Sequence, residues 1–286
     1  MPPPPSGQWG LSQLREAVPC AAVPEKPLVM GVVNVTPDSF SDGGRYEDHD
    51  AAIAHGLALV EEGADIVDVG GESTRPGAEP VPEAEELRRV VPVVEALSGH
   101  VRVSIDTRKA AVADAALSAG ATLLNDVSAS LAPVAAAHGA GFVAMHMLGD
   151  PRTMQDDPRY GDVVADVRDF LVARADDARQ AGVGEIWIDP GIGFGKTAEH
   201  SWSLLRHLNV LVETGFPVAV GTSRKRFLGA VLARSDGRPD GELVPTDDRL
   251  EGSVATAVWA IMQGARMIRV HDVRATVHAV TVVAGQ

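Results

Sequence analysis

Polar side chains recur in this chain at the points where predicted buried strands end. Asp106, Asn125 and Asp189 each close a short, largely apolar run. Carboxylates and amides match the edge of a guanidine-like heterocycle, because its amino and ring N–H groups need hydrogen-bond acceptors. Each residue alone is also typical of a helix N-cap, and acids can bind metals, but the chain has no two-histidine, one-carboxylate pattern. The three together therefore favour a site that binds the edge of a base-like ring.

Cationic side chains follow the last two predicted strands. Lys225 lies in the segment SRK, and Arg269 and His271 lie in RVHD. Arg269 and His271 are separated by one residue, so both project from the same face of a strand. A single cation after a strand often serves only solubility. A cluster of cations in a chain of net charge −14 favours an anion site, and hence a phosphate-bearing substrate.

The sequence offers no nucleophile for covalent catalysis. The one cysteine, Cys20, lies in a proline-flanked leader, and there is no G-x-S-x-G elbow. Gly191–Thr197 (GIGFGKT) is similar to a phosphate-binding loop, but Pro190 occupies a position that such a loop needs as glycine. We therefore exclude nucleotide hydrolysis and expect these glycines to let the main chain approach a planar ligand. The reactivity should lie in the substrates, one of them an activated, phosphorylated electrophile.

These residues need a scaffold that brings strand ends together, and eight predicted strands alternate with helices along the chain. The strands are expected over Leu28–Val33, Asp65–Gly70, Val101–Asp106, Thr122–Asp126, Phe142–His146, Glu185–Asp189, Pro217–Gly221 and Arg266–Val270. The helices are expected over Ala51–Glu62, Pro82–Leu97, Lys109–Ala119, Asp162–Ala181, Trp202–Thr214, Arg249–Gln263 and Arg274–Val283. Strands that are apolar almost throughout are typical of a parallel sheet covered on both faces.

The predicted fold is α/β, a single-domain (β/α)8 TIM barrel. In a barrel the carboxyl ends of all strands form one ring around the mouth, whereas in an open sheet they lie along an edge. The polar residues of this ring are Asn34, Glu72, Thr74, Asp106, Asn125, His146, Asp189, Ser223, Lys225, Arg269 and His271. Two glycine-rich βα loops, Asp38–Tyr46 and Gly71–Ala78, are longer than usual and are expected to act as lids.

Composition sets further bounds. A chain of 286 residues with 45% hydrophobic content can bury a large core, and its acidity argues against a nucleic-acid or anionic-membrane surface. No apolar run approaches a membrane span, and there is no signal peptide, so we expect a reduced, cytoplasmic protein. We expect a flexible proline-rich tail over residues 1–26 and one barrel domain over residues 27–286. Ser235–Asp247 is expected to be a polar, mobile insertion.

Eight motifs in order give the chain a family resemblance from about Lys26 to its C-terminus. They read MGVVNVTPDSFSDGG, VDVGGESTRPGA, VSIDT, NDVSA, MHMLGDPRTMQ, DPGIGFGKT, GTSRKRFLG and RVHDV. Together they resemble bacterial dihydropteroate synthase. The resemblance implies a pterin-binding (β/α)8 barrel and a homodimer with Mg²⁺ as cofactor. It also implies condensation of (7,8-dihydropterin-6-yl)methyl diphosphate with 4-aminobenzoate, and inhibition by sulfonamides.

The resemblance also implies roles for single residues. The pterin would be bound by Asp106, Asn125, Met145, Asp189, Phe194, Gly221 and Lys225. The diphosphate would be bound by Asn34, Thr74, Arg269 and His271, with Asn34 as the Mg²⁺ ligand. The 4-aminobenzoate would be enclosed by Phe40, Arg75, Pro76 and Ser223. The catalytic group would be Asp106, Asp189, Lys225, Arg269 and His271. The implied mechanism is dissociative, which agrees with the missing nucleophile.

Two other functions remain as alternatives. A non-catalytic pterin-binding paralogue would keep Asp106, Asn125 and Asp189 but lose Asn34 or the SRK and RVHD segments, all of which are intact here. A methyltetrahydrofolate:corrinoid methyltransferase shares the pterin-binding barrel but would lack the TPDSFSDGG loop and would need a cobalamin partner. Turnover of the pterin diphosphate separates the three.

Overall fold

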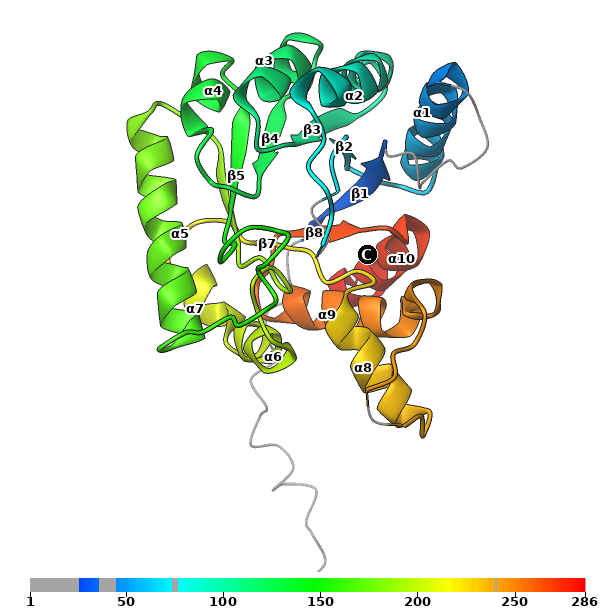
Figure 1. The fold of residues 1–286 in the computed structure, drawn as a ribbon, viewed down its shortest axis with the longest axis vertical. Helices are drawn as coiled ribbons and strands as arrows, with labels where there is room; N and C mark the ends of the chain where they lie inside the picture. Colours follow the sequence, from blue (N-terminus) through cyan, green and yellow to red (C-terminus); the bar gives the residue numbers. More distant parts are fainter. Residues whose placement is uncertain (1–25, 36–44, 74–76, 240, 286) are drawn as a thin grey trace, which may run out of the picture.

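The computed structural model describes residues 26–35, 45–73, 77–239 and 241–285, and they form a barrel of eight parallel strands with helices around it (Figure 1). The strands are β1 Leu28–Asn34, β2 Ile66–Gly70, β3 Arg102–Asp106, β4 Leu123–Asp126, β5 Gly141–Met145, β6 Ile186–Asp189, β7 Ala219–Val220 and β8 Met267–Val270. All eight predicted strands are present, and the predicted (β/α)8 barrel is confirmed.

The strand order is β6-β5-β4-β3-β2-β1-β8-β7, with β1 beside both β2 and β8. A parallel bridge between Ile188 and Val218 joins β6 to the segment that leads into β7, and so closes the barrel. The Ile188 N–H donates to the Pro217 carbonyl at 3.1 Å across this joint. The β6–β7 joint is therefore held by fewer hydrogen bonds than the continuous ladders elsewhere in the described sheet.

The strands are apolar along most of their length because both of their faces are buried. One face of each strand packs inside the barrel, where the fully or nearly fully buried side chains are Met30, Ile66, Leu123, Val143, Trp187, Ala219 and Met267. The other face packs under the helices, in a larger cluster that includes Val67, Ile105 and Phe142. This double burial explains why the strand sequences lack the alternation of a half-exposed sheet.

The helices are α1 Arg45–Glu61, α2 Glu83–Leu97, α3 Ala110–Ser118, α4 Ala132–Ala137, α5 Val163–Gln180, α6 Ala198–Arg206, α7 Leu208–Val212, α8 Arg226–Ser235, α9 Leu250–Met262 and α10 Val273–Ala284. Helices α2, α3 and α4 cover one side of the barrel in Figure 1, and α8, α9 and α10 cover the opposite side. A short 3₁₀ helix, η3 Thr246–Asp248, precedes α9.

Three helix predictions need correction. The sequence does not predict the short, alanine-rich α4, because α4 has no polar face. It does not predict α8 either, because the first residues of α8 continue the predicted loop after the seventh strand. The predicted helix Trp202–Thr214 is two helices, α6 and α7, which meet at His207. Helix α6 begins early because Thr197 caps it: the Thr197 side chain accepts from the His200 N–H at 3.1 Å.

Several predictions concern residues outside the described part of the chain. They are the position of Cys20, residues 1–25 of the predicted tail, and residues 38–44 and 74–76 of the two lid loops. The division into a tail and a barrel domain therefore stays a prediction. Ser235–Asp247 does not form a free loop along its whole length, because Ser235 ends α8 and Val244 is only 1% exposed. No helix in the described ranges is long and apolar enough to cross a membrane.

The packed interior of the barrel should contribute to its stability. Leu123→Ala removes a fully buried side chain from the interior cluster, and we expect it to lower the free energy of unfolding by about 2–5 kcal/mol. Urea denaturation measures the change. Leu250→Ala, at a leucine on α9 that is 39% exposed, is the matched control and should cost much less. Equal losses for the two variants would contradict the assignment of Leu123 to the core.

Candidate functional site

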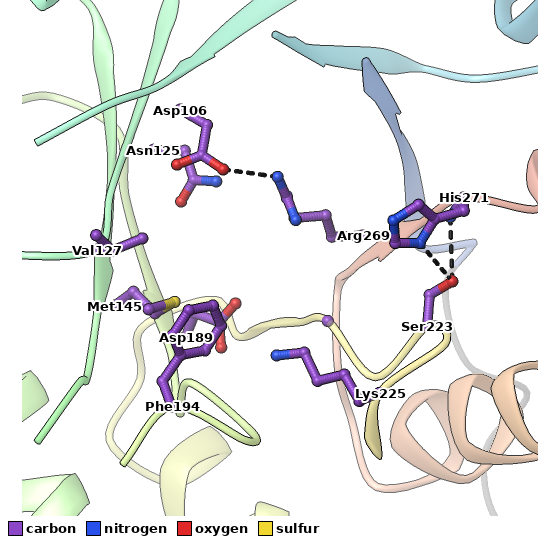
Figure 2. Close-up of a pocket in the computed structure, with 11 residues that line it drawn as sticks. Asp106, Asn125, Val127, Met145, Asp189, Phe194, Ser223, Lys225, Arg269 and His271 are labelled. Carbon is purple, nitrogen blue, oxygen red and sulfur yellow. Dashed lines mark hydrogen bonds and ion pairs between the residues drawn. The ribbon is translucent and has the colours of Figure 1, made fainter. Parts of the chain in front are cut away.

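A pocket opens at the carboxyl ends of the strands (Figure 2). Its lining residues are Asp106, Asn125, Val127, Met145, Asp189, Phe194, Gly221, Ser223, Lys225, Arg269 and His271. Ten of these eleven are among the residues singled out from the sequence, and only Val127 was not. It follows Asn125 by two positions, just past the end of β4, so it faces the same way.

The register of the parallel strands pairs four of these residues two by two. Asp106 on β3 is the register partner of Asn125 on β4, and Met145 on β5 is the partner of Asp189 on β6. Neighbouring strands lie only about 5 Å apart. Four residues from four consecutive strands therefore form a continuous arc along one wall of the pocket.

Arg269, on β8, connects this arc to the other half of the barrel. Its Nε donates to Asp68 Oδ2 at 2.6 Å, and its Nη2 donates to Asp106 Oδ2 at 2.7 Å. Asp68 Oδ2 also accepts from Asn125 Nδ2 at 3.0 Å. Figure 2 shows Arg269 extending from the side of His271 toward Asp106. One guanidinium thus orients two acids and, through Asp68, the amide of Asn125.

Asp68 belongs to this network, but a search for polar residues at the ends of predicted strands does not find it. It lies in the middle of β2 and is completely buried. The signal in the sequence is a charged residue inside an otherwise apolar strand, since a buried carboxylate requires a partner. Ser104, its register partner on β3, interrupts the next strand in the same way.

Burial and charge shift the pKa values of this network. Burial raises the pKa of Asp106 to about 7, with Arg269 opposing the rise and Asp68 adding to it by repulsion. Burial disfavours the charge of Arg269, but Asp68 and Asp106 outweigh it and raise the pKa of the guanidinium. Arg269 is therefore always charged, whereas Asp106 exchanges its proton near neutral pH.

Lys225 and Asp189 form a second charged pair in the pocket. Burial lowers the pKa of Lys225 to about 8, and Asp189 opposes that fall. Burial likewise raises the pKa of Asp189, against the effect of Lys225. The Lys225 ammonium donates to the Ile192 carbonyl and lies 4.4 Å from the centre of the Phe194 ring, a cation–π distance. The Asp189 Oδ1 accepts from the Gly191 N–H at 2.7 Å, which fixes the carboxylate.

Ser223 and His271 face each other on the far side of the pocket. The Ser223 Oγ accepts from the His271 main-chain N–H at 3.1 Å and lies 3.0 Å from its ring Nδ1. A hydroxyl that accepts one bond can donate its own proton to Nδ1. For the neutral ring this selects the tautomer with its proton on Nε2. Asp272, the next residue, pairs with Arg224 outside the pocket lining.

Two glycines of the GIGFGKT loop, Gly191 and Gly195, face protein main chain, which corrects the expectation that they approach a planar ligand. Gly191 and Gly195 have φ of 61° and 59°. A Cβ at Gly191 would lie 1.9 Å from the His146 carbonyl oxygen, and one at Gly195 would lie 2.3 Å from that of Leu148. The glycines therefore let this loop pack directly on the main chain that follows β5.

Lys196 and His146 join these two loops from behind the pocket. The Lys196 Nζ contacts the His146 Nδ1 at 2.9 Å, and it donates to the carbonyls of His146 at 3.2 Å and Phe194 at 3.0 Å. Burial lowers the pKa of Lys196 well below its ordinary value, and burial followed by repulsion from Lys196 lowers the pKa of His146 to about 3. His146 is thus a neutral structural residue and does not line the pocket.

Other residues predicted for the mouth lie elsewhere. Glu72 binds Arg108 and Lys109 at the root of the β2–α2 loop, and so lies outside the pocket lining. Asn34 ends β1 and does not line the pocket either. Four predicted contacts fall outside the described residues: Phe40, Thr74, Arg75 and Pro76. Within the described ranges no group of three or more histidine, cysteine or acidic side chains could hold a metal ion.

Comparisons with known proteins identify the family of the chain. Residues 30–271 match the family described as pterin binding enzyme. The dihydropteroate synthase of Mycobacterium leprae is 51% identical over 89% of this chain and 92% of its own. A Xanthomonas albilineans dihydropteroate synthase solved with 4-aminobenzoic acid has a TM-score of 0.81 and 48% identity, over 90% of this chain and 92% of that one. A structure from the same organism with 7,8-dihydropteroate has a TM-score of 0.77 and 45% identity over the same shares.

The barrel fold and the family match over residues 30–271 thus place the chain among the pterin-binding enzymes. Within that class the chain belongs to the dihydropteroate synthase family, the transferases that make dihydropteroate in folate biosynthesis.

The raised pKa of Asp106 can be tested by titration. Asp68→Asn removes a neighbouring negative charge, so we expect the pKa of Asp106 to fall below about 7. Carbon-13 NMR of the side-chain carboxyl groups measures the titration midpoint. Asp114→Asn, at an aspartate whose side chain is 68% exposed on α3, should leave that midpoint unchanged. A midpoint that stays in place or rises in Asp68→Asn would refute the repulsion between the two acids.

Proposed function

We propose that the pocket binds the pterin of (7,8-dihydropterin-6-yl)methyl diphosphate and that the enzyme transfers its pterinylmethyl group to 4-aminobenzoate. The products are 7,8-dihydropteroate and diphosphate. The observation that carries the proposal is one pocket lined by three acceptor side chains, Asp106, Asn125 and Asp189, with the ammonium of Lys225 opposite. The relatives solved with 4-aminobenzoic acid and with 7,8-dihydropteroate support it.

The pocket matches a pterin in hydrogen bonding and in shape. The 2-amino-pyrimidinone edge of a pterin presents amino and ring N–H donors and one carbonyl acceptor. Asp106, Asn125 and Asp189 supply acceptors for the donors, and Lys225 supplies a donor for the carbonyl. Met145 and the Phe194 ring provide apolar contact for the faces of the planar ligand, so orientation follows from both its edge and its faces.

The chemistry needs positioning and charge stabilisation rather than a nucleophile. The bond between the methylene carbon and the diphosphate oxygen breaks first, and the electron pair leaves with diphosphate. The resulting cation is delocalised into the pterin, where Asp106 and Asp189 stabilise its positive charge. The amine nitrogen of 4-aminobenzoate then forms the new C–N bond and loses a proton. Fixed charges that are already oriented lower such a barrier without reorganising.

The leaving group would lie at the cationic side of the mouth. The proposal assigns Arg269 and His271 to the diphosphate and Ser223 to the 4-aminobenzoate. The hydrogen bond between Ser223 and the His271 ring supports this, because it directs an Nε2–H of the neutral ring as a donor. Phe40, Thr74, Arg75 and Pro76 complete the proposed substrate contacts.

Mg²⁺ belongs to the same proposal, with Asn34 as its protein ligand. Asn34 is partly exposed at the carboxyl end of β1, and an amide oxygen is a hard donor of the kind that Mg²⁺ prefers. Mg²⁺ commonly keeps several waters and takes few protein ligands besides substrate phosphates, so a single amide fits a metal that arrives with diphosphate. When bound, the ion would neutralise charge that develops on the leaving diphosphate.

We also infer a cytoplasmic homodimer. Helix α9 exposes half of the surface of Trp259 and of Met262, and α10 exposes 80% of Val282. Large exposed apolar side chains are typical of an interface between protein chains. Sedimentation equilibrium would report a monomer if this part of the proposal is wrong.

The decisive experiment measures product formation. The purified protein should form dihydropteroate from the pterin diphosphate and 4-aminobenzoate with Mg²⁺ present, and a sulfonamide should block the reaction. Chelation of Mg²⁺ should lower the rate strongly. Retained pterin binding without any turnover would instead indicate a non-catalytic paralogue.

The role of Asp106 can be tested by binding alone. Asp106→Asn replaces an acceptor by a group that is half donor and leaves buried polar groups mispaired, so we expect pterin binding to weaken by about 1–3 kcal/mol. Calorimetry with a 6-hydroxymethylpterin measures the change. Asp169→Asn, on the surface of α5 with 68% of its side chain exposed, should bind as the wild type does. Unchanged affinity in Asp106→Asn would remove Asp106 from the site.

A further inference from the structure

Arg249, the residue before α9, has an unusual set of partners for a buried arginine. It is only 7% exposed. Its Nε and Nη2 both donate to the Val244 carbonyl, at 2.9 and 2.6 Å, and its Nη1 donates to the Arg224 carbonyl at 2.9 Å. No described carboxylate forms an ion pair with it. Burial of a charge without an opposite charge is costly, and burial lowers the pKa of Arg249.

At the other end of this link, Arg224 lies between two residues of the pocket lining without lining the pocket itself. Arg224 is the middle residue of SRK, so its neighbours are Ser223 and Lys225, which both line the pocket. Its φ is +59°, in the left-handed region that non-glycine residues rarely adopt. A turn in such a conformation persists only where the surrounding contacts hold it.

The main-chain N–H, the carbonyl and the guanidinium of Arg224 all form hydrogen bonds. Its N–H donates to the Ser253 Oγ at 2.9 Å. Its guanidinium forms a double hydrogen bond with Asp272, at 3.0 Å from Nε to Oδ2 and at 2.5 Å from Nη2 to Oδ1. Its carbonyl accepts from Arg249, whose own carbonyl accepts from the Ser253 hydroxyl at 2.6 Å. The side chain of Arg249 therefore holds the turn directly, and its main-chain carbonyl orients the Ser253 hydroxyl that also binds the turn.

The Val244 end lies in the insertion that precedes α9. The Val244 N–H donates to the Gly229 carbonyl on α8 at 3.1 Å, and the side chain is 1% exposed. Gly229 makes room for the guanidinium, because a Cβ at this position would lie 2.7 Å from the Arg249 Nε. One side chain thus joins the end of the insertion, helix α8 and the turn at the pocket.

We infer that Arg249 is a positioning residue that fixes the SRK turn through main-chain carbonyls. It holds the turn so that Ser223 meets His271 and Lys225 reaches the pterin side of the pocket, and it connects this turn to the insertion at Val244. The inference rests on the proposed function for the identity of the ligands. Arg249 does not line the pocket, so its effect must pass through Ser223 and Lys225.

The test combines a truncation with chemical rescue. Arg249→Ala should retain its circular dichroism spectrum but lose on the order of 10- to 100-fold in kcat/KM, since small displacements of positioned groups have costs of this size. Guanidinium ion at millimolar concentration should enter the cavity, bind the two carbonyls and restore part of the activity. Arg234→Ala, at an exposed arginine on α8, is the matched control and should show neither loss nor rescue.

A second variant keeps the test decisive if Arg249→Ala does not fold. Arg249→Lys keeps the charge but offers a single point donor, which cannot hold both carbonyls. It should weaken binding of a 6-hydroxymethylpterin, measured by calorimetry, with a smaller change in the melting temperature than in the affinity. A folded variant with wild-type kcat/KM and wild-type pterin affinity would overturn the inference. So would a loss of activity that guanidinium does not restore.

The outcomes also separate this inference from the proposed function. Wild-type protein that binds the pterin without turnover contradicts the synthase reaction, yet the calorimetric comparison of Arg249→Lys with wild type still decides the role of Arg249. Turnover by the wild type with full activity in both Arg249 variants contradicts the positioning role and leaves the synthase reaction intact.

Discussion

A guanidinium held between two carboxylates is the interaction on which the mouth of the barrel depends. Arg269 pairs with Asp68 and Asp106, and both acids would be unpaired in the barrel without it. Removing one partner from such a network is strongly destabilising, because the remaining charges lose their compensation. The pocket lining itself has two carboxylates, Asp106 and Asp189, and two cations, Lys225 and Arg269. Asp68, which does not line the pocket, adds a further carboxylate through its ion pair with Arg269.

The loops around this network are supported from behind by two buried basic side chains that donate to main-chain carbonyls. Lys196 joins the loop after β6 to the loop after β5, and Arg249 joins the turn after β7 to the insertion before α9. A hydrogen bond to a main-chain carbonyl fixes the path of the main chain directly, whereas a contact between two side chains fixes only the ends of those side chains. Burying Lys196 and Arg249 costs desolvation energy. Both residues lie where the path of the loop decides which way Phe194 or Lys225 points.

Much of the fold and part of the site follow from the sequence. Eight apolar runs alternating with helices predict the barrel, and because parallel strand ends meet at one mouth, Asp106 and Asp189 could be expected in one pocket. Asp68 could not be placed by that reasoning, since it acts from the middle of a strand. The sequence predicts that Gly191 lets the main chain approach a ligand, because it does not show that the main chain after β5 passes nearby. Helix α8 was missed because its first residues continue a motif that functions as a turn.

The least bonded joint of the barrel runs through the active site. Strands β6 and β7 meet at the single bridge between Ile188 and Val218, as far as the described residues show. Asp189 follows Ile188 on one side of this joint, and Lys225 follows β7 on the other. Asp189 and Lys225, which shift each other's pKa, thus lie on opposite sides of the β6–β7 joint. A fluctuation that opens the β6–β7 joint changes both the width of the pocket and the electrostatic field between Asp189 and Lys225. The flexibility of the barrel at this joint and the electrostatics of the ligand site are therefore coupled.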